Sequence, residues 1–130
     1  KHFKDFLRHM YGDQPQRWSK SLSGWSQQRF CTNALTRLRF CTANGRLDMA
    51  SSGPPGTEPP GYMPWFEVPG RESSKLNLVT GHWSALGTVI RPGVLSLDSG
   101  CVWGQHLTAY RLDKKSKPVT VKCNGQCDGH

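Results

Sequence analysis

The chain has 130 residues, a formal net charge of +8 and a pI of about 9.6. Only 35% of its residues are hydrophobic, whereas globular domains usually have about 45–50%. We therefore expect a thin core in one small domain or in a piece of a larger one. No apolar stretch approaches the roughly 20 residues of a membrane-spanning helix, and no signal-peptide pattern is present. The sequence predicts a soluble protein, and its start at Lys1 suggests missing upstream sequence.

The basic character of the chain favours polyanionic partners. Nucleic acid, an anionic lipid surface and a phosphate-rich small molecule are all consistent with it. Only Lys114–Lys117 forms a basic run, and such runs are usually solvated surface. The charge by itself selects no partner.

The cysteines number five: Cys31, Cys41, Cys101, Cys123 and Cys127. An odd number without regular spacing argues against a secreted disulfide framework, so we expect free thiols in a reducing cytoplasm. The terminal group of Cys123, Cys127 and His130 is loosely spaced and lacks a fourth ligand for zinc.

The first third of the chain predicts two short helices. Apolar residues at helical spacing mark residues 3–10, and Gly12–Pro15 ends this helix. A second helix is expected to begin at Ser26 as its N-cap. Its apolar stripe consists of Phe30, Cys31, Ala34, Leu35 and Leu38. Both helices should lie on a core, and the second should turn outward a basic side that consists of Arg29, Arg37 and Arg39.

Mostly antiparallel strands are predicted for the rest of the chain. Asn44-Gly45 is typical of a type I′ hairpin turn between strands at 40–43 and 46–49. Residues 51–64 are expected to form an irregular loop or lid, because eight of the twelve residues from 53 to 64 are Gly or Pro. The later strands are predicted at 76–80, 94–98, 107–112 and 119–122.

Three features are candidates for chemistry. His82 directly follows a predicted strand and Gly81, a place where metal ligands often lie, although a lone histidine there is more often packed or exposed without a function. Asp98 follows another strand, where it either orients a histidine or satisfies its own turn. Arg37 and Arg39 suit phosphate recognition or a solvated helix face.

Six motifs occur in an order that resembles one enzyme family. They are Met10–Ser19, Thr36–Cys41, Asn44–Met49, Pro64–Phe66, Gly81–Leu86 and Leu97–Gly104. Together they resemble the C-terminal portion of the symmetrical bis(5′-nucleosyl)-tetraphosphatases. These are bacterial diadenosine tetraphosphatases of the phosphoprotein-phosphatase-like metallophosphoesterase superfamily. The resemblance runs from about residue 6 to residue 112.

The resemblance implies an α+β chain, the C-terminal part of the superfamily's α/β sandwich fold. Residues 1–75 would form a cap-like region of helices, hairpin and Pro/Gly-rich loop. Residues 76–113 would form the C-terminal strands of the sandwich with the Gly-His loop, and residues 114–130 would be a basic polar tail.

The resemblance also implies that diadenosine tetraphosphate is cleaved into two ADP at a site with two divalent ions, commonly manganese or cobalt. The metal motifs of the family's N-terminal half are absent here, so we expect this fragment to need that half and to be inactive alone. The expected partner is a dinucleoside polyphosphate, and neither nucleic acid nor membrane is expected. Two alternatives stay open, a protein Ser/Thr phosphatase of the same superfamily and a small basic nucleic-acid-binding module.

Few residues carry over from the family. His82 matches its late metal-binding histidine, and Asp98 matches a position that would support the site rather than bind metal. Arg37 and Arg39 lie in the cap-like part and are candidates for substrate binding, whereas no catalytic residue is assigned. Core packing rather than stacking on adenine is expected for Trp65, Phe66 and Trp83.

Overall fold

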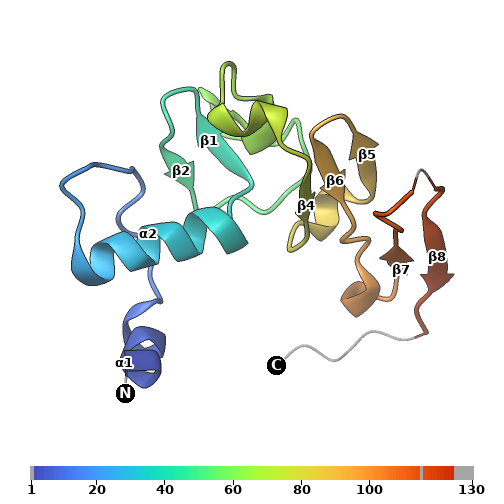
Figure 1. Cartoon of the computed structure of the whole chain (residues 1–130), viewed down its shortest axis with the longest axis horizontal. Coiled ribbons are helices and arrows are strands. Elements are labelled where there is room, and N and C mark those ends of the chain that lie inside the picture. Colours follow the sequence, from blue (N-terminus) through green and yellow to red (C-terminus); the bar gives the residue numbers. More distant parts are fainter. Residues whose placement is uncertain (1, 115, 125–130) are drawn as a thin grey trace. The chain divides into compact units, whose positions relative to one another are not determined.

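The computed structural model of the chain describes residues 2–114 and 116–124 and shows a mixed α+β protein (Figure 1). Its contacts divide it into two compact units, an N-terminal unit (Lys1–Arg71) and a C-terminal unit (Glu72–His130). Four of the five strand pairings in the described residues are antiparallel. None of the helices in that part of the chain is long and apolar enough to cross a membrane.

The N-terminal unit contains two α-helices and three strands, namely α1 (His2–His9), α2 (Gly24–Thr36), β1 (Phe40–Thr42), β2 (Leu47–Asp48) and β3 (Tyr62–Pro64). The expected helix at residues 3–10 is thus present as α1. No residue of α1 is buried, and Phe3 is 71% exposed, so the expectation that this helix lies on a core is wrong. Its main contact is to α2, where the rings of His9 and Trp25 stack at 4.5 Å.

Helix α2 starts earlier than its sequence predicts. Its N-cap is Ser23, with extended backbone angles, and Ser26 lies inside the first turn. Trp25, which lies upstream of Ser26, stacks on His9 and so ties the first turn of α2 to α1. The buried side consists of Phe30 and Asn33, three residues apart. Leu35 is 85% exposed, because two further residues rotate it about 200° away from Asn33.

The predicted hairpin is confirmed, but its turn differs. Phe40 pairs with Asp48 across β1 and β2. A type I′ turn needs a positive φ at both central residues, yet only Gly45 has one (+80°), and Asn44 does not. The Gly45 N–H donates to the Thr42 carbonyl at 2.9 Å, so the turn begins at Thr42 and ends in a left-handed glycine. This is the longer hairpin loop in which glycine forms a bulge.

The segment predicted as an irregular loop ends in a strand. Residues 62–64 form β3, which pairs antiparallel with β1 and places Tyr62 opposite Thr42. Pro64 hid this strand from the sequence, since proline is accepted at a sheet edge but weakens the strand pattern. The resulting sheet has the order β2-β1-β3. It covers a core of Phe30, Cys41, Leu47 and Met49.

The described residues of the C-terminal unit contain five strands, β4 (Leu78–Thr80), β5 (Val89–Arg91), β6 (Val94–Ser96), β7 (His106–Ala109) and β8 (Val119–Lys122). All four predicted strands are present. Strand β8 has the predicted bounds, β4 and β6 are shorter, and β7 is shorter and begins one residue earlier. Strand β5 is an additional one. They make two sheets, β4-β6-β5 and the two-stranded β7-β8. In the first sheet β4 runs parallel to the central strand β6, whereas β5 runs antiparallel to it.

A disulfide links Cys101 to Cys123, with the two Cα atoms 5.5 Å apart. The expectation of free thiols is therefore wrong for this pair and confirmed for Cys31 and Cys41. The pairing of β7 with β8 brings the two cysteines together, because the Cys123 N–H donates to the Gln105 carbonyl at 2.8 Å. That long-range pairing has no local signal in the sequence.

The disulfide also bears on the terminal zinc motif, which the sequence already disfavoured. A disulfide sulfur of Cys123 is not a thiolate that could ligate a metal. The other two members of the motif, Cys127 and His130, lie outside the described residues.

Candidate functional site

The Gly-His loop follows β4 and is fixed on both sides of His82. Upstream, the carbonyl of Thr80 accepts a hydrogen bond from the Leu97 N–H at 3.1 Å. Downstream, Trp83 is only 3% exposed, and its carbonyl accepts from the Leu86 N–H at 3.0 Å. A buried large aromatic ring stabilises its segment strongly. The backbone on either side of His82 therefore has little freedom.

His82 itself is exposed and has a φ of +66°, the one positive φ outside glycine among residues 2–114 and 116–124. A side chain with Cβ rarely adopts this left-handed conformation, and such strain gathers at functional sites. Gly81 does not serve a close approach to any described residue, since a Cβ built there meets none of their atoms within 4 Å. The loop thus presents an imidazole to the outside on a constrained and strained backbone.

Asp98 reaches the same sheet edge as His82. Thr80 and Ser96 are partners in the parallel pairing of β4 and β6, and His82 and Asp98 each lie two residues beyond. Parallel strands end at the same edge of a sheet, so the structure brings these two predicted residues to one edge. The Asp98 Oδ1 accepts from the Gly100 N–H at 3.2 Å, which is the bond of a turn residue.

A buried hydroxyl lies close to this edge. Ser96 is 1% exposed, and its Oγ has no hydrogen-bond partner among the described residues. Burying a polar atom without a partner is costly. Neither the resemblance nor the spacing pointed to Ser96, which is hidden in an apolar strand.

Arg37 lies in the N-terminal unit, directly after α2. Its Nη1 donates to the Asp13 Oδ1 and to the Asn33 Oδ1, each at 3.1 Å. Asn33 is 1% exposed and donates from Nδ2 to the Gly12 carbonyl at 2.9 Å. These residues border a hollow of about 360 Å³. Arg37 is therefore already paired with a carboxylate, and Asp13 and Asn33 are partners that the sequence did not reveal.

The other arginines of this region hold the backbone or lie half-buried. Arg29, expected on an outward face, donates from Nε to the His9 carbonyl at 2.9 Å and from Nη1 to the Gln14 carbonyl at 3.1 Å. It therefore ties the segment after α1 to α2. Arg39 is half-buried, and its carbonyl accepts from the Trp65 N–H at 3.0 Å. Arg37 and Arg39 share the N-terminal unit, whereas His82 and Asp98 belong to the C-terminal one.

The three aromatic residues considered for stacking lie mainly inside. Phe66 and Trp83 are 8% and 3% exposed, which confirms core packing for both. Trp65 is half-buried, with the Arg71 guanidinium carbon 5.4 Å from its ring centroid.

Burial also raises the pKa of the Cys41 thiol, so this free cysteine is a packing residue rather than a nucleophile.

The described residues do not form a metal centre by themselves. Over residues 2–114 and 116–124 no three side chains of His, Cys, Asp or Glu come together in a way that could hold an ion. A divalent metal in an enzyme usually takes at least three protein ligands. The described residues alone therefore do not provide such a set of ligands.

Comparison with known proteins shows which family the chain belongs to. No protein-family model matches it. It is 56% identical over 110 residues to a protein of Thioalkalivibrio sulfidiphilus and 51% identical over 110 residues to one of Aromatoleum aromaticum. The match covers 85% of this chain and about two fifths of each relative, 41% and 40%. A relative from Paraburkholderia phymatum is 46% identical over 127 residues, 98% of this chain and 45% of its own length, so the similarity continues past residue 112.

All three relatives carry the name symmetrical bis(5′-nucleosyl)-tetraphosphatase. The chain spans about two fifths of the length of the first two relatives. The chain belongs to the symmetrical bis(5′-nucleosyl)-tetraphosphatase family and corresponds to a C-terminal part of its proteins.

Proposed function

We propose that this chain is part of a hydrolase that cleaves diadenosine tetraphosphate symmetrically into two ADP. The observation that supports this most is the 46–56% identity, over 85–98% of the chain, to proteins of that name. The net charge of +8 agrees with a polyanionic substrate. The fold that we propose for the complete protein is the metallophosphoesterase sandwich, with residues 1–75 as a cap.

Within this hydrolase we assign His82 as one ligand of a two-metal site that holds manganese or cobalt. Its exposed side chain on a fixed, strained loop supports the assignment. Asp98, at the same sheet edge, is proposed to support the site. The described residues do not fit a metal ion alone. We propose that the remaining ligands come from family sequence outside this chain, and we expect the chain alone to be inactive.

Arg37 and Arg39 are proposed to bind substrate phosphate in the N-terminal unit. The pairing of Arg37 with Asp13 sets a condition on this role, because an incoming phosphate must share the guanidinium with a carboxylate at 3.1 Å. Arginine presents several donors in one plane, so it can bind both partners at once. We also propose a cytoplasmic location. The sequence analysis supported it by expecting free thiols, and the Cys101–Cys123 disulfide removes two of these thiols.

A chimera tests the proposed function. This chain replaces the matching 110 residues of the Thioalkalivibrio sulfidiphilus relative, and the products of diadenosine tetraphosphate are separated with Mn²⁺ or Co²⁺ present. We expect ADP as the sole product from the chimera and no product from the isolated chain. AMP with ATP would contradict symmetrical cleavage. Preference for a phosphopeptide over the dinucleotide would support a protein phosphatase instead.

The same chimera tests the site assignment. His82→Ala should lower metal occupancy and turnover together, turnover by at least about a hundredfold, because it removes a ligand. Asp98→Asn should lower turnover by about tenfold, as expected for a supporting group. His106→Ala is the matched control, since His106 is also an exposed histidine of the C-terminal unit, and it should leave turnover unchanged. Unchanged turnover in His82→Ala would remove the metal assignment.

A further inference from the structure

The hairpin between β1 and β2 carries an asparagine followed by a glycine at its tip. Asn44 and Gly45 are both exposed, and a Cβ built on Gly45 meets no atom of the described residues within 4 Å. The side-chain carbonyl carbon of an asparagine is close along the chain to the backbone nitrogen of the next residue, and a glycine there leaves that nitrogen unhindered. The tip therefore places an electrophilic amide carbon next to an accessible amide nitrogen.

A threonine hydroxyl is bound to the side chain of Asn44. The Thr42 Oγ1 donates to the Asn44 Oδ1 at 2.6 Å, and it accepts from the Arg46 N–H at 3.0 Å. The Arg46 carbonyl accepts in turn from the Thr42 N–H at 2.9 Å, so the hydroxyl is held in place. A fixed donor on a carbonyl oxygen stabilises the negative charge that forms on this oxygen when a nucleophile attacks the carbon. The Thr42 hydroxyl therefore favours attack on the Asn44 Cγ.

One hydrogen bond of the turn opposes this attack. The Gly45 N–H donates to the Thr42 carbonyl at 2.9 Å, and the nitrogen must lose this bond and its proton before it can attack. Residues 43–46 are all exposed, and exposed backbone hydrogen bonds at a loop tip open more readily than those of a core strand. We therefore expect the reaction to proceed in the folded chain, but more slowly than in the unfolded chain.

We propose that Asn44 is a modification site, at which the side-chain amide is converted to a carboxylate through a cyclic imide. The Gly45 nitrogen forms a bond to the Asn44 Cγ, and the bond from Cγ to the side-chain nitrogen breaks. That nitrogen leaves as ammonia and takes with it the proton of the Gly45 nitrogen. Water then opens the ring: addition at Cγ gives aspartate, and addition at the backbone carbonyl carbon of residue 44 gives isoaspartate. The proposal rests on the hairpin and not on the proposed reaction of the hydrolase.

The two products affect the hairpin differently. Aspartate adds a negative charge to a chain of net charge +8 and keeps the length of the backbone. Isoaspartate inserts a side-chain carbon into the backbone, so the turn from Thr42 to Gly45 no longer closes with the same geometry. The strands that this turn joins place Cys41 opposite Leu47, and both residues belong to the core of the N-terminal unit. Isoaspartate at position 44 therefore loosens that core.

Peptide mapping by mass spectrometry tests the site. The 130-residue chain is incubated in heavy-oxygen water at neutral pH, and isoaspartate is measured with an isoaspartyl methyltransferase. We expect Asn44 to take up heavy oxygen and to form isoaspartate. No conversion of Asn44 in the folded chain, over a time in which the same chain in urea converts it fully, would overturn the proposal.

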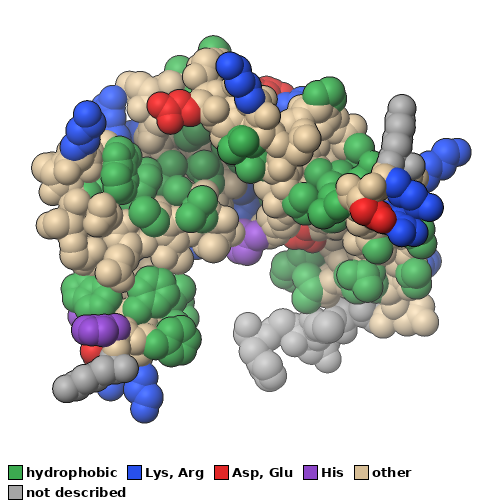
Figure 2. Space-filling view, in the orientation of Figure 1, with side chains coloured by type: hydrophobic (Ala, Val, Ile, Leu, Met, Phe, Trp, Pro, Cys, Tyr) green, Lys and Arg blue, Asp and Glu red, His purple; other side chains and the backbone are tan. Residues whose placement is uncertain are grey.

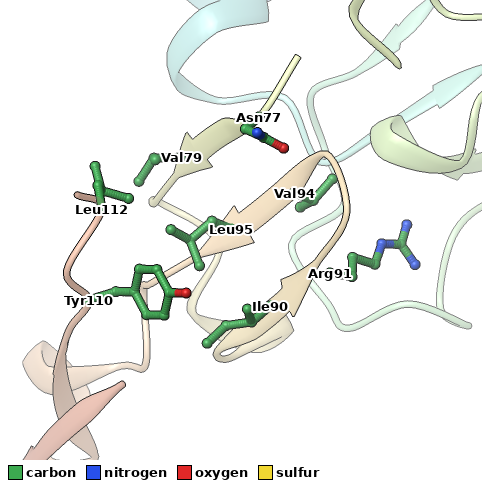
Figure 3. Close-up of a pocket in the computed structure, with 8 residues that line it drawn as sticks. All are labelled: Asn77, Val79, Ile90, Arg91, Val94, Leu95, Tyr110 and Leu112. Atoms are coloured by element: carbon green, nitrogen blue, oxygen red, sulfur yellow. The ribbon is translucent and has the colours of Figure 1, made fainter. Parts of the chain in front are cut away.

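Asn77 is the matched control within the same chain. It is exposed like Asn44 but precedes Leu78, whose side chain hinders attack by the backbone nitrogen. Figure 3 shows Asn77 directly before β4, at the border of a hollow of about 430 Å³. Asn77 should keep its amide throughout the incubation. Equal conversion at Asn44 and Asn77 would contradict a site that depends on the hairpin tip.

The role of Thr42 has its own variant. Thr42→Val keeps the shape of the side chain and removes the donor, so conversion of Asn44 in the folded chain should fall by at least about threefold. In urea the variant and the original chain should convert at equal rates, because the hairpin is lost in both. Faster conversion in the folded variant would show that opening of the turn alone sets the rate, and it would remove the role of Thr42.

The effect on the core is read from thermal unfolding before and after incubation. The Tm of the original chain should fall by at least about 3 °C as isoaspartate accumulates. Asn44→Gln is the control, since its longer side chain forms the corresponding ring much more slowly, and its Tm should stay the same. An equal fall in both proteins would contradict the assignment of the loss to position 44.

Discussion

The backbone at His82 is more informative than its side chain. The neighbouring Thr80 and Trp83 are held by hydrogen bonds and burial, so the φ of +66° is imposed by both flanks. A residue with Cβ in this conformation costs roughly 1 kcal/mol or more. A strained residue persists where the surrounding structure determines it. The positive φ occurs at His82 and not at the preceding Gly81. The conformational strain is therefore at a residue with a Cβ.

Comparing His82→Gly with His82→Ala isolates this strain. Both variants lose the imidazole and its contacts, but only glycine adopts a positive φ without a Cβ penalty. We expect His82→Gly to have a free energy of unfolding about 1 kcal/mol higher than His82→Ala in urea titrations of the 130-residue chain. Equal stability of the two variants would mean that the loop relaxes and stores no strain.

At the scale of elements, the hairpin turn depends on one glycine. Gly45 has a φ of +80°, and a Cβ there would meet no atom within 4 Å. Gly45→Ala should therefore destabilise the chain by about 1 kcal/mol through backbone strain alone. Gly81→Ala is the control, because the space at Gly81 is also open and its φ is not positive. It should be neutral or slightly stabilising in the same urea titration; a loss equal to that of Gly45→Ala would contradict this account.

The hairpin β7-β8 depends on its disulfide. Every residue of β8 is exposed, and an isolated two-stranded sheet is marginal in water. A disulfide that closes a loop of this size, with a sequence separation of 22, contributes about 3 kcal/mol. We therefore expect Cys123→Ser, or reduction by a dithiol, to speed amide exchange in Val119–Lys122 by at least about tenfold.

Two controls accompany this prediction. Cys31→Ser changes a free thiol in the N-terminal unit and should leave exchange in β8 unchanged. Amides of the sheet β2-β1-β3 should exchange at the same rate before and after reduction. If exchange in β8 does not respond to reduction, strand pairing alone holds this hairpin.

Local signals predicted the fold better than long-range ones. The helices and the hairpin followed from spacing and from Asn44-Gly45, because their hydrogen bonds join residues close in sequence. Strand β3 was missed because Pro64 masks it, and the Cys101–Cys123 disulfide was missed because it depends on the register of β7 with β8. For the candidate site, the positions of His82 and Asp98 in the chain were predicted from the order of the six motifs. The strain at His82 and the pairing of Arg37 with Asp13 are tertiary effects that no local pattern encodes.

The whole chain has few buried apolar residues for its length. In the described part of the C-terminal unit the buried hydrophobic residues are Trp83 and Val94, while large apolar side chains such as Ile90 and Leu112 stay exposed. Small domains bury a low fraction of their surface and are marginal for that reason. The chain spans only about two fifths of the length of the relatives it matches.

The net charge of +8 belongs to the whole molecule and makes a last prediction. On the visible face of the N-terminal unit in Figure 2, Lys and Arg side chains form separate groups rather than one continuous stripe. We therefore expect only non-specific binding to RNA or DNA, with a Kd on the order of 10⁻⁴–10⁻⁶ M at physiological salt and equal for unrelated sequences. Fluorescence anisotropy across a salt series measures the Kd for each of the unrelated sequences and so shows whether the values are equal. Submicromolar, sequence-dependent binding that persists at high salt would instead favour the nucleic-acid-binding alternative, because non-specific phosphate contacts weaken steeply as counterions accumulate.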